Sequence, residues 1–275
     1  MILFRRFRRG EVIFGLALLG VLVICFMCWP ALSSVNPYQS QVSNRLRSPS
    51  FIHPFGTDDF GRDVLVRVMY AGRLSLALGF MVAAFACLVG TALGLVAGFL
   101  RRLDGPISRL LDALMAFPDI LLAIALLAAF GPNLVNAVIA LGLVYMPRIA
   151  RVVRAATLVQ RELPFVEAAL SMGASTGRIL WVHILPNLLA PLFVQGTFVF
   201  AYAMLTEAAL SFLGAGVPPE LPTLGNMIAA GQPYFGRAEW MMIFPGLAIA
   251  LTVLALQTLG DGLRDALDPL MARGR

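Results

Sequence analysis

Residues 74–100 read LSLALGFMVAAFACLVGTALGLVAGFL, a run without a charged side chain. About 20 consecutive apolar residues suffice for a helix to cross the hydrocarbon core of a bilayer. Backbone polar groups in lipid must be satisfied within the spanning element, which favours helices. Further apolar runs begin near residues 12, 110, 134, 188 and 241. The sequence therefore predicts an all-α integral membrane protein with six transmembrane helices.

The composition excludes an ordinary soluble domain. Charged residues make up only 13% of the 275-residue chain, and the mean hydropathy is +0.84, whereas soluble domains carry about 25% charged residues. All 21 basic residues are arginine, which excludes mechanisms built on a lysine. The arginines lie beside apolar runs rather than on a basic face with aromatics, which favours membrane orientation over nucleic-acid binding.

The arginines also predict the orientation of the chain. With the N-terminus inside, 15 arginines fall on the cytoplasmic side, at positions 5, 6, 8, 9, 101, 102, 109, 148, 151, 154, 161, 178, 264, 273 and 275. Six fall outside, at positions 45, 47, 62, 67, 73 and 237. This asymmetry fits the positive-inside rule with both termini cytoplasmic. The first apolar run resembles a signal peptide but is long for one, so we expect a retained first span.

The spans and loops suggest a division of the chain near residue 72. Residues 1–72 are predicted to form an anchor span and a polar external segment. Residues 73–275 are predicted to form a five-span core with a long cytoplasmic loop at about 151–188. The second span is expected to end where charge and helix breakers coincide, at residues 101–106, and the third to be kinked at Phe117-Pro118. The fourth is expected to leave the membrane through Pro147, Arg148, Arg151 and Arg154. No convincing internal repeat is visible, so a two-fold transport path would need a second chain.

The cysteines and histidines predict neither a metal site nor a catalytic residue. Cys25 and Cys28 have a C-x-x-C spacing, but they and Cys87 lie inside apolar runs, where small buried hydrophobes are expected. His53 and His183 are too few to complete a metal cluster.

The cytoplasmic loop carries the clearest local signals. Pro164 suits the first turn of a helix, and Gly173 can adopt the left-handed conformation that ends one. Ser175 or Thr176 can cap a second helix, which Pro186 ends or bends. The loop thus predicts two short helices hinged near Gly173.

The first of these helices is predicted to be amphipathic. Its apolar side consists of Phe165, Val166, Ala169 and Leu170. Glu167 and Ser171 share another side at a four-residue spacing. Such a helix can simply rest at the membrane interface, or it can present a surface to a partner.

The order of residues in the loop favours a partner. Glu167-Ala168-Ala169 is followed after three residues by Gly173, and Leu185-Pro186 begins twelve positions later. This pattern closely resembles the EAA loop of permease subunits in ATP-binding-cassette (ABC) importers. The adjoining sequence His-Ile-Leu-Pro-Asn, which begins at His183, resembles the peptide and nickel branch of that family.

Three further segments resemble the same branch, and the likeness covers nearly the whole chain. They are residues 56–63 (GTDDFGRD), 210–214 (LSFLG) and 260–269 (GDGLRDALDP). The resemblance implies the bundle of a type I ABC importer permease in a bacterial inner membrane. It is similar to the second permease of dipeptide, oligopeptide, glutathione or nickel importers.

The resemblance also implies partners and contact residues. The expected partners are a second homologous permease forming a heterodimer, two cytoplasmic ATPases, and a periplasmic or extracellular substrate-binding protein. ATP and magnesium would be used by the ATPases, and this chain would bind no cofactor, catalyse nothing and contact no nucleic acid. The residues expected to couple it to an ATPase are Glu167, Ala168, Ala169, Gly173, Leu185 and Pro186.

Charged residues inside a span are functional candidates by default. Asp119 and Glu207 are therefore candidates for the translocation path, although Glu207 can equally pair with a partner helix. Asp112 lies three residues after Arg109, which predicts a local ion pair.

The external stretch with Asp58, Arg62 and Asp63 has two readings. The three side chains can satisfy one another in a compact turn, or they can contact a substrate-binding protein.

Two other functions compete with the importer. A secondary transporter or channel would work without ATP, and a membrane scaffold would carry no solute. The first predicts internal repeats, paired membrane charges or a pore ring, none of which is clear in the sequence. The identity of the solute does not follow from these residues.

Overall fold

The structure, a computed structural model, describes residues 10–32 and 36–267. The arginines at positions 5, 6, 8, 9, 273 and 275, and the Asp268-Pro269 end of the C-terminal motif, lie outside the described residues. The elements in chain order are α2 (Gly10–Leu32), η1 (Val42–Asn44), α3 (Val64–Phe99), α4 (Arg101–Met115), α5 (Asp119–Phe130), α6 (Leu134–Gln160), α7 (Pro164–Ser171), α8 (Thr176–Arg178), η2 (Ile179–Ile184), α9 (Leu185–Phe212), α10 (Leu224–Gly231), η3 (Gln232–Tyr234) and α11 (Trp240–Leu267).

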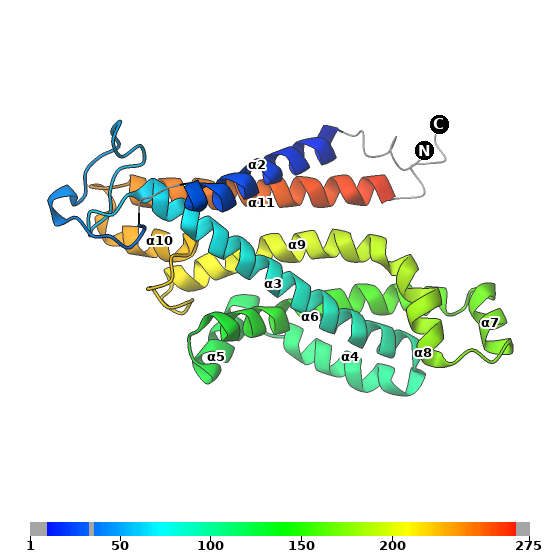
Figure 1. The fold of residues 1–275 in the computed structure, drawn as a ribbon. Coiled ribbons are helices and arrows are strands. Elements are labelled where there is room, and N and C mark those ends of the chain that lie inside the picture. The colour runs from blue at the N-terminus through cyan, green and yellow to red at the C-terminus, as the bar shows by residue number, and fades with distance from the viewer. Residues whose placement is uncertain (1–9, 33–35, 268–275) are drawn as a thin grey trace.

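The described residues contain five helices that are long and apolar enough to cross a membrane, or six if one bent pair counts as a span. The five are α2, α3, α6, the continuous run Thr176–Phe212, and α11. This confirms the predicted all-α membrane bundle (Figure 1). Long unbroken apolar runs explain the result, because each one satisfies its own backbone groups.

The third span was predicted to be one kinked helix, and this prediction is wrong. Two helices cover residues 110–130: α4 ends at Met115, α5 begins at Asp119, and their axes differ by 95°. Pro118 disfavours a helical conformation at Phe117, which separates them. The second span ends close to the expected place, since α3 ends at Phe99, but the helix breakers Gly105 and Pro106 lie inside α4.

The helix of the fourth span is longer than its apolar run. It continues to Gln160, past Pro147 and Arg148, where the span was expected to leave the membrane. Pro147 is buried inside the helix. Arg148 therefore lies near the middle of α6, directly after its apolar run.

A stripe of glycines brings α3 and α6 into close contact. Gly90, Gly94 and Gly98 recur every four residues along α3, on one face of the helix. A Cβ atom added at Gly94 would lie 2.6 Å from the backbone oxygen of Ala150 on α6. Small residues at this spacing let membrane helices approach each other, where dispersion contacts hold them together.

Two apolar clusters fill the interior. The first joins α3, α4, α5, α6, α7, η2 and α9, and includes Leu141 and Ile149. The second joins α2, α3, α9, α10 and α11, and includes Phe26 and Leu256. Figure 1 shows α2 and α11 side by side, with α3 running diagonally from α2 at one end of the bundle to α6 at the other. The helices α3 and α9 thus belong to both clusters.

The first span packs on the last. Gly15 of α2 faces the backbone of Leu259 on α11, and Val12 of α2 lies against Gly262. Gly10 and Leu267 consequently lie at the same end of the bundle as α7 (Figure 1). Cys25 and Cys28 are exposed on α2, so the expectation that they are buried is wrong, whereas Cys87 is half-buried.

Candidate coupling and translocation sites

The EAA loop leaves α6 and forms the short helix α7. Pro164 occupies its first turn, as predicted. Gly173 follows with φ +79°, a left-handed conformation that glycine adopts without strain. The Ser175 hydroxyl oxygen then accepts a hydrogen bond from the backbone N–H of Arg178 and caps the next helix. The predicted hinge at Gly173 is confirmed.

The second short helix differs from the prediction in its extent. After α8 the chain makes one π-helical turn, η2, and continues into α9 without a break. Pro186 lies in the first turn of α9 and does not end the helix. Its missing N–H leaves a carbonyl of the preceding turn free, and the wider π-helical turn accommodates this.

The α7 helix is fixed on one side and free on the other. Val166 and Ala169 are buried in the first apolar cluster. Glu167, Ala168 and Gly173 are exposed. Leu185 is half-buried and Pro186 is exposed at the start of α9, and so the structure does not bring these two into the surface of α7.

The exposed side of α7 is partly apolar. Phe165 and Leu170, predicted to share the apolar side with Val166, are 39% and 51% exposed, and Met172 is 81% exposed. Apolar side chains of this size in an exposed group mark a docking surface. We call Phe165, Glu167, Ala168, Leu170 and Met172 the α7 surface.

Three arginines on one face of α6 pair with three aspartates of α4 and α5. Arg154 contacts Asp104 through two nitrogens, one of them 2.8 Å from Oδ2. Arg151 Nη2 lies 2.7 Å from Asp112 Oδ1, and Arg148 contacts Asp119. We call these pairs the α6 ladder. The predicted Asp112–Arg109 pair is wrong, because the α4 helix turns Asp112 toward α6.

Asp119 and Arg148 line a cavity of about 460 Å³ between α5, α6 and α9. The Arg148 guanidinium carbon lies 5.4 Å from the centre of the Tyr145 ring and 5.6 Å from that of Tyr202. Both distances are within the range of cation–π attraction. The Tyr145 hydroxyl shares a hydrogen bond with Thr206, which fixes the ring.

Glu207 occupies a different place from Asp119. Its side chain is only 2% exposed, and Oε1 accepts hydrogen bonds of 2.9 Å from the hydroxyls of Ser211 and Thr223. Thr223 caps α10, and the backbone N–H of Leu224 donates to Ser75 of α3. Glu207 therefore ties α10 to α9 in this conformation. Its role in translocation stays a prediction.

The external turn satisfies its own charges, as one of the two readings predicted. Asp58 Oδ2 lies 2.6 Å from Arg62 Nε, and Asp58 Oδ1 accepts from the backbone N–H groups of Phe60 and Arg62. Asp63 caps α3 and lies 2.8 Å from His53. Contact of these residues with a binding protein remains untested.

Comparisons with known proteins identify the family of this chain. The family described as "Binding-protein-dependent transport system inner membrane component" matches residues 90–273. The chain belongs to this family. These permeases are transport subunits rather than enzymes, and ATP hydrolysis lies in separate subunits. The membership also separates the chain from the secondary transporters considered above.

Several curated permeases are similar over almost their whole length. A peptide transport system permease of Brucella suis is 48% identical, with 96% of this chain and 90% of the relative covered. A dipeptide transport system permease of Alkalihalophilus pseudofirmus is 44% identical over 98% and 89%, respectively. A glutathione transport system permease of Pectobacterium atrosepticum is 41% identical over 96% and 89%.

A solved structure shares the fold of the family. A chain of the MetNI methionine ABC transporter in an inward-facing conformation aligns with a TM-score of 0.60 and 23% identity. The alignment covers 74% of this chain and 97% of that chain. The likeness supports the fold predicted from the EAA loop.

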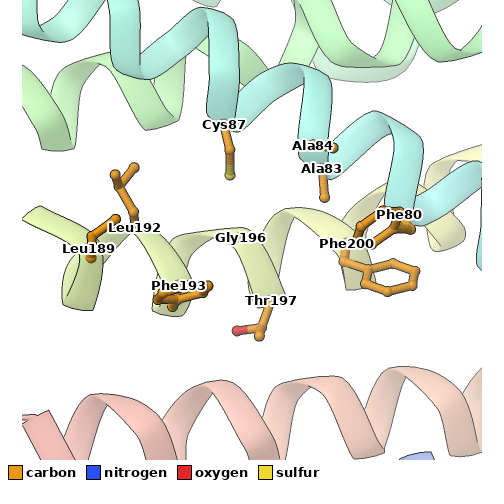
Figure 2. A pocket seen from close by; sticks show the side chains of 10 residues that line it. All are labelled: Phe80, Ala83, Ala84, Cys87, Leu189, Leu192, Phe193, Gly196, Thr197 and Phe200. Carbon is orange, nitrogen blue, oxygen red and sulfur yellow. The ribbon is translucent and has the colours of Figure 1, made fainter. Parts of the chain in front are cut away.

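A second cavity of this permease is apolar. It has a volume of about 290 Å³ between α3 and α9. Figure 2 shows Cys87 and Ala83 on α3 pointing toward α9, where Gly196 leaves room between Leu192 and Phe200. Because no charged residue lines it, this cavity does not suit a peptide with charged termini.

Most of the residues that line the cavity at Asp119 were not predicted from the sequence. Arg148 was assigned to the cytoplasmic surface, and Tyr145, Tyr202 and Thr206 were not selected. A signal was present, because Arg148, Arg151 and Arg154 recur every three residues and so lie near one another on a helix. Their aspartate partners lie 29 to 50 residues earlier in the chain, beyond the reach of a local pattern.

Proposed function

We propose that this chain is one of two permease subunits through which a peptide, or a related solute such as glutathione, crosses the inner membrane. The names of the most similar relatives support this substrate class. A distinct second permease would complete the path, and a substrate-binding protein would deliver the solute outside. The α7 end would lie in the cytoplasm with both termini, as the arginine distribution supports.

The observation that carries the proposed mechanism is the α7 surface. One side of α7 is buried against the bundle, and the other presents Glu167 and apolar side chains to solvent. We propose that this surface docks on a cytoplasmic ATPase. Glu167 would make a charge-assisted hydrogen bond to a cation of that subunit, and Phe165, Leu170 and Met172 would be buried.

Movement of α7 would then reach the bundle along α6 and the run Thr176–Phe212. Because Val166 and Ala169 are packed in the first apolar cluster, displacement of α7 cannot leave its neighbours unchanged. ATP bound with magnesium would close the two ATPases, and their motion would switch the bundle between inward-open and outward-open states. Asp119 would face the path that opens, whereas Glu207 would hold α10 in place.

Charge reversal tests the docking surface. We expect Glu167→Arg combined with Gly173→Pro to abolish co-purification of the ATPase and solute uptake in a reconstituted complex. Glu220→Arg is the matched control, since Glu220 is also exposed but follows α9 near the opposite end of the bundle. Normal uptake and ATPase assembly in the Glu167→Arg, Gly173→Pro variant would show that the coupling role is wrong.

The external end provides a second contact for the complex. We propose that the substrate-binding protein contacts the surface around Asp58, Arg62 and Asp63. Asp58 and Arg62 pair with each other and Asp63 pairs with His53, but Phe60 beside them is 53% exposed. Loss of crosslinking to the binding protein in Phe60→Ser, with ATPase assembly intact, would support this contact.

A further inference from the structure

The Asp119–Arg148 pair joins two apolar helices of the bundle. Arg148 lies near the middle of α6, directly after its apolar run, and Asp119 begins α5. Charged residues within membrane-spanning helices are rare and mark binding sites, proton relays or ion paths. The pair is therefore a functional candidate as well as a link between two helices.

The pair is also incompletely covered. The side chains of Arg148 and Asp119 are 39% and 37% exposed. Lipid is an unfavourable neighbour for these charges, so a water-filled space or another protein chain must adjoin them. The cavity beside them is lined by Tyr202 and Thr206 as well as Tyr145, and its volume of about 460 Å³ lies within the range of small-molecule sites. A water-filled substrate path fits the charged and hydroxyl groups in the wall of this cavity.

Both charged groups keep bonding capacity. Arg148 has five N–H donors, and within the described part of the chain its hydrogen bond goes to Asp119 Oδ2. Asp119 Oδ1 makes no recorded hydrogen bond to the described residues. The two tyrosine rings hold the guanidinium in place, so the free donors have a fixed direction before any ligand arrives.

We propose that Asp119, Arg148 and Tyr202 form a binding site for the two charged termini of a short peptide within the permease. The free N–H groups of Arg148 would donate to the C-terminal carboxylate, and Asp119 Oδ1 would accept from the N-terminal ammonium. The exposed ring of Tyr202 would contact the apolar atoms between them. The inference rests on the proposed function as a peptide permease and assigns the substrate contact within it.

The α6 ladder provides a matched control. Arg151 of α6 and Asp112 of α4 form the same kind of pair, but they are 50% and 62% exposed and do not line the cavity. Arg148→Gln and Arg151→Gln remove the same charge from the two pairs. If both pairs only held helices together, the two substitutions would reduce import to a similar extent.

The experiment uses the full complex with its partner permease, ATPases and binding protein in proteoliposomes, with dialanine as the probe. We measure uptake and ATP hydrolysis together. In Arg148→Gln we expect at least a tenfold loss of dialanine imported per ATP hydrolysed, since a charge-assisted hydrogen bond is lost. ATP hydrolysis stimulated by the loaded binding protein should remain, and Arg151→Gln should import normally.

Each alternative result has a meaning. If the wild-type complex imports no dialanine, the short-peptide part of the proposed function fails and this inference with it. If wild type imports it and Arg148→Gln matches Arg151→Gln, only the inference is overturned. The Arg148→Gln complex would fail to assemble if the pair faced the second permease. In that case Arg148→Lys is used instead, because it keeps the charge but loses the planar guanidinium group. Normal import by Arg148→Lys overturns the proposal, and tenfold lower import by an assembled complex supports it.

Discussion

Asp58 and Asp59 are adjacent in the external turn but have opposite environments. Asp58 is 4% exposed and accepts hydrogen bonds from two backbone N–H groups and from Arg62. Asp59 Oδ1 is buried without a hydrogen bond, with Arg62 Nη2 no closer than 3.8 Å. Asp58 therefore stabilises the turn through its hydrogen bonds, whereas the buried carboxylate of Asp59 destabilises it.

The Asp59 side chain gives a pH-dependent prediction. Burial, and then the charge of Asp58, raise the pKa of Asp59 above its ordinary value of 3.8. The folded state thus disfavours the ionised form, and this penalty is present at neutral pH and lost as the pH falls toward 3.8. We expect Asp59→Asn to raise the thermal midpoint in detergent at pH 7, with the gain disappearing under acidic conditions. A pH-independent effect would contradict this account.

Asp58→Asn should have the opposite effect. Hydrogen bonds to a charged group contribute about 1.5–3 kcal/mol each, and the amide can replace only part of them. We expect a lower thermal midpoint and faster proteolysis of the external turn. A variant as stable as wild type would show that the backbone alone maintains the turn.

Gly173 and Gly177 test the hinge of the EAA loop. Both have open space where a Cβ would be added, but only Gly173 has a positive φ. A non-glycine residue in that conformation costs about 1–2 kcal/mol. We expect Gly173→Ala to reduce uptake several-fold by shifting α7, and Gly177→Ala to leave it unchanged. Equal uptake by the two variants would exclude a role for the left-handed conformation.

At the scale of elements, the glycine stripe of α3 determines how closely α6 can pack. A Cβ at Gly94 meets backbone of α6 rather than a flexible side chain, so relief requires the helices to separate. We expect Gly94→Ala to destabilise the bundle by about 1–3 kcal/mol, as overpacking does. Gly20→Ala in α2 is the control, because nothing lies within 4 Å of its added Cβ. The measurement is the thermal midpoint in detergent of each purified variant.

The elements that the sequence predicted well are those with local causes. Pro164, Gly173 and Ser175 act on their immediate neighbours through ring geometry, backbone conformation and capping, so the shape of the EAA loop followed from them. The span that contains Phe117 was mispredicted, because an apolar run does not record the direction of a helix. The partner of Arg148 was missed, because Asp119 lies 29 residues earlier in the chain.

Of the two candidate sites, one follows from local sequence signals and the other depends on tertiary packing. The α7 surface was largely predictable, since a short helix with a known hinge exposes a definite face. The cavity at Asp119 was not, because it combines residues of α5, α6 and α9 that no short pattern connects. Tertiary packing alone reveals that Arg148 is shared between an aspartate and two tyrosine rings.

At the scale of the whole molecule, the two ends of the bundle should differ in their access to labels. We expect a cysteine at Ser48 to react with a membrane-impermeant maleimide in intact cells. A cysteine at Ser171 should react only after the membrane is opened, because α7 lies at the opposite end (Figure 1). Both positions are exposed. The background would carry alanine at the three native cysteines, and the reverse labelling pattern would overturn the proposed orientation.

The α6 ladder also bears on how the chain enters the membrane during synthesis. An unpaired arginine within a span raises the free energy of insertion by about 2.5–3.5 kcal/mol. The aspartates of the ladder precede the arginines in the chain, so α4 and α5 leave the ribosome before α6 does. We therefore expect the countercharges to be present when Arg148 reaches the translocon. This order of residues in the chain would lower the free energy of inserting α6.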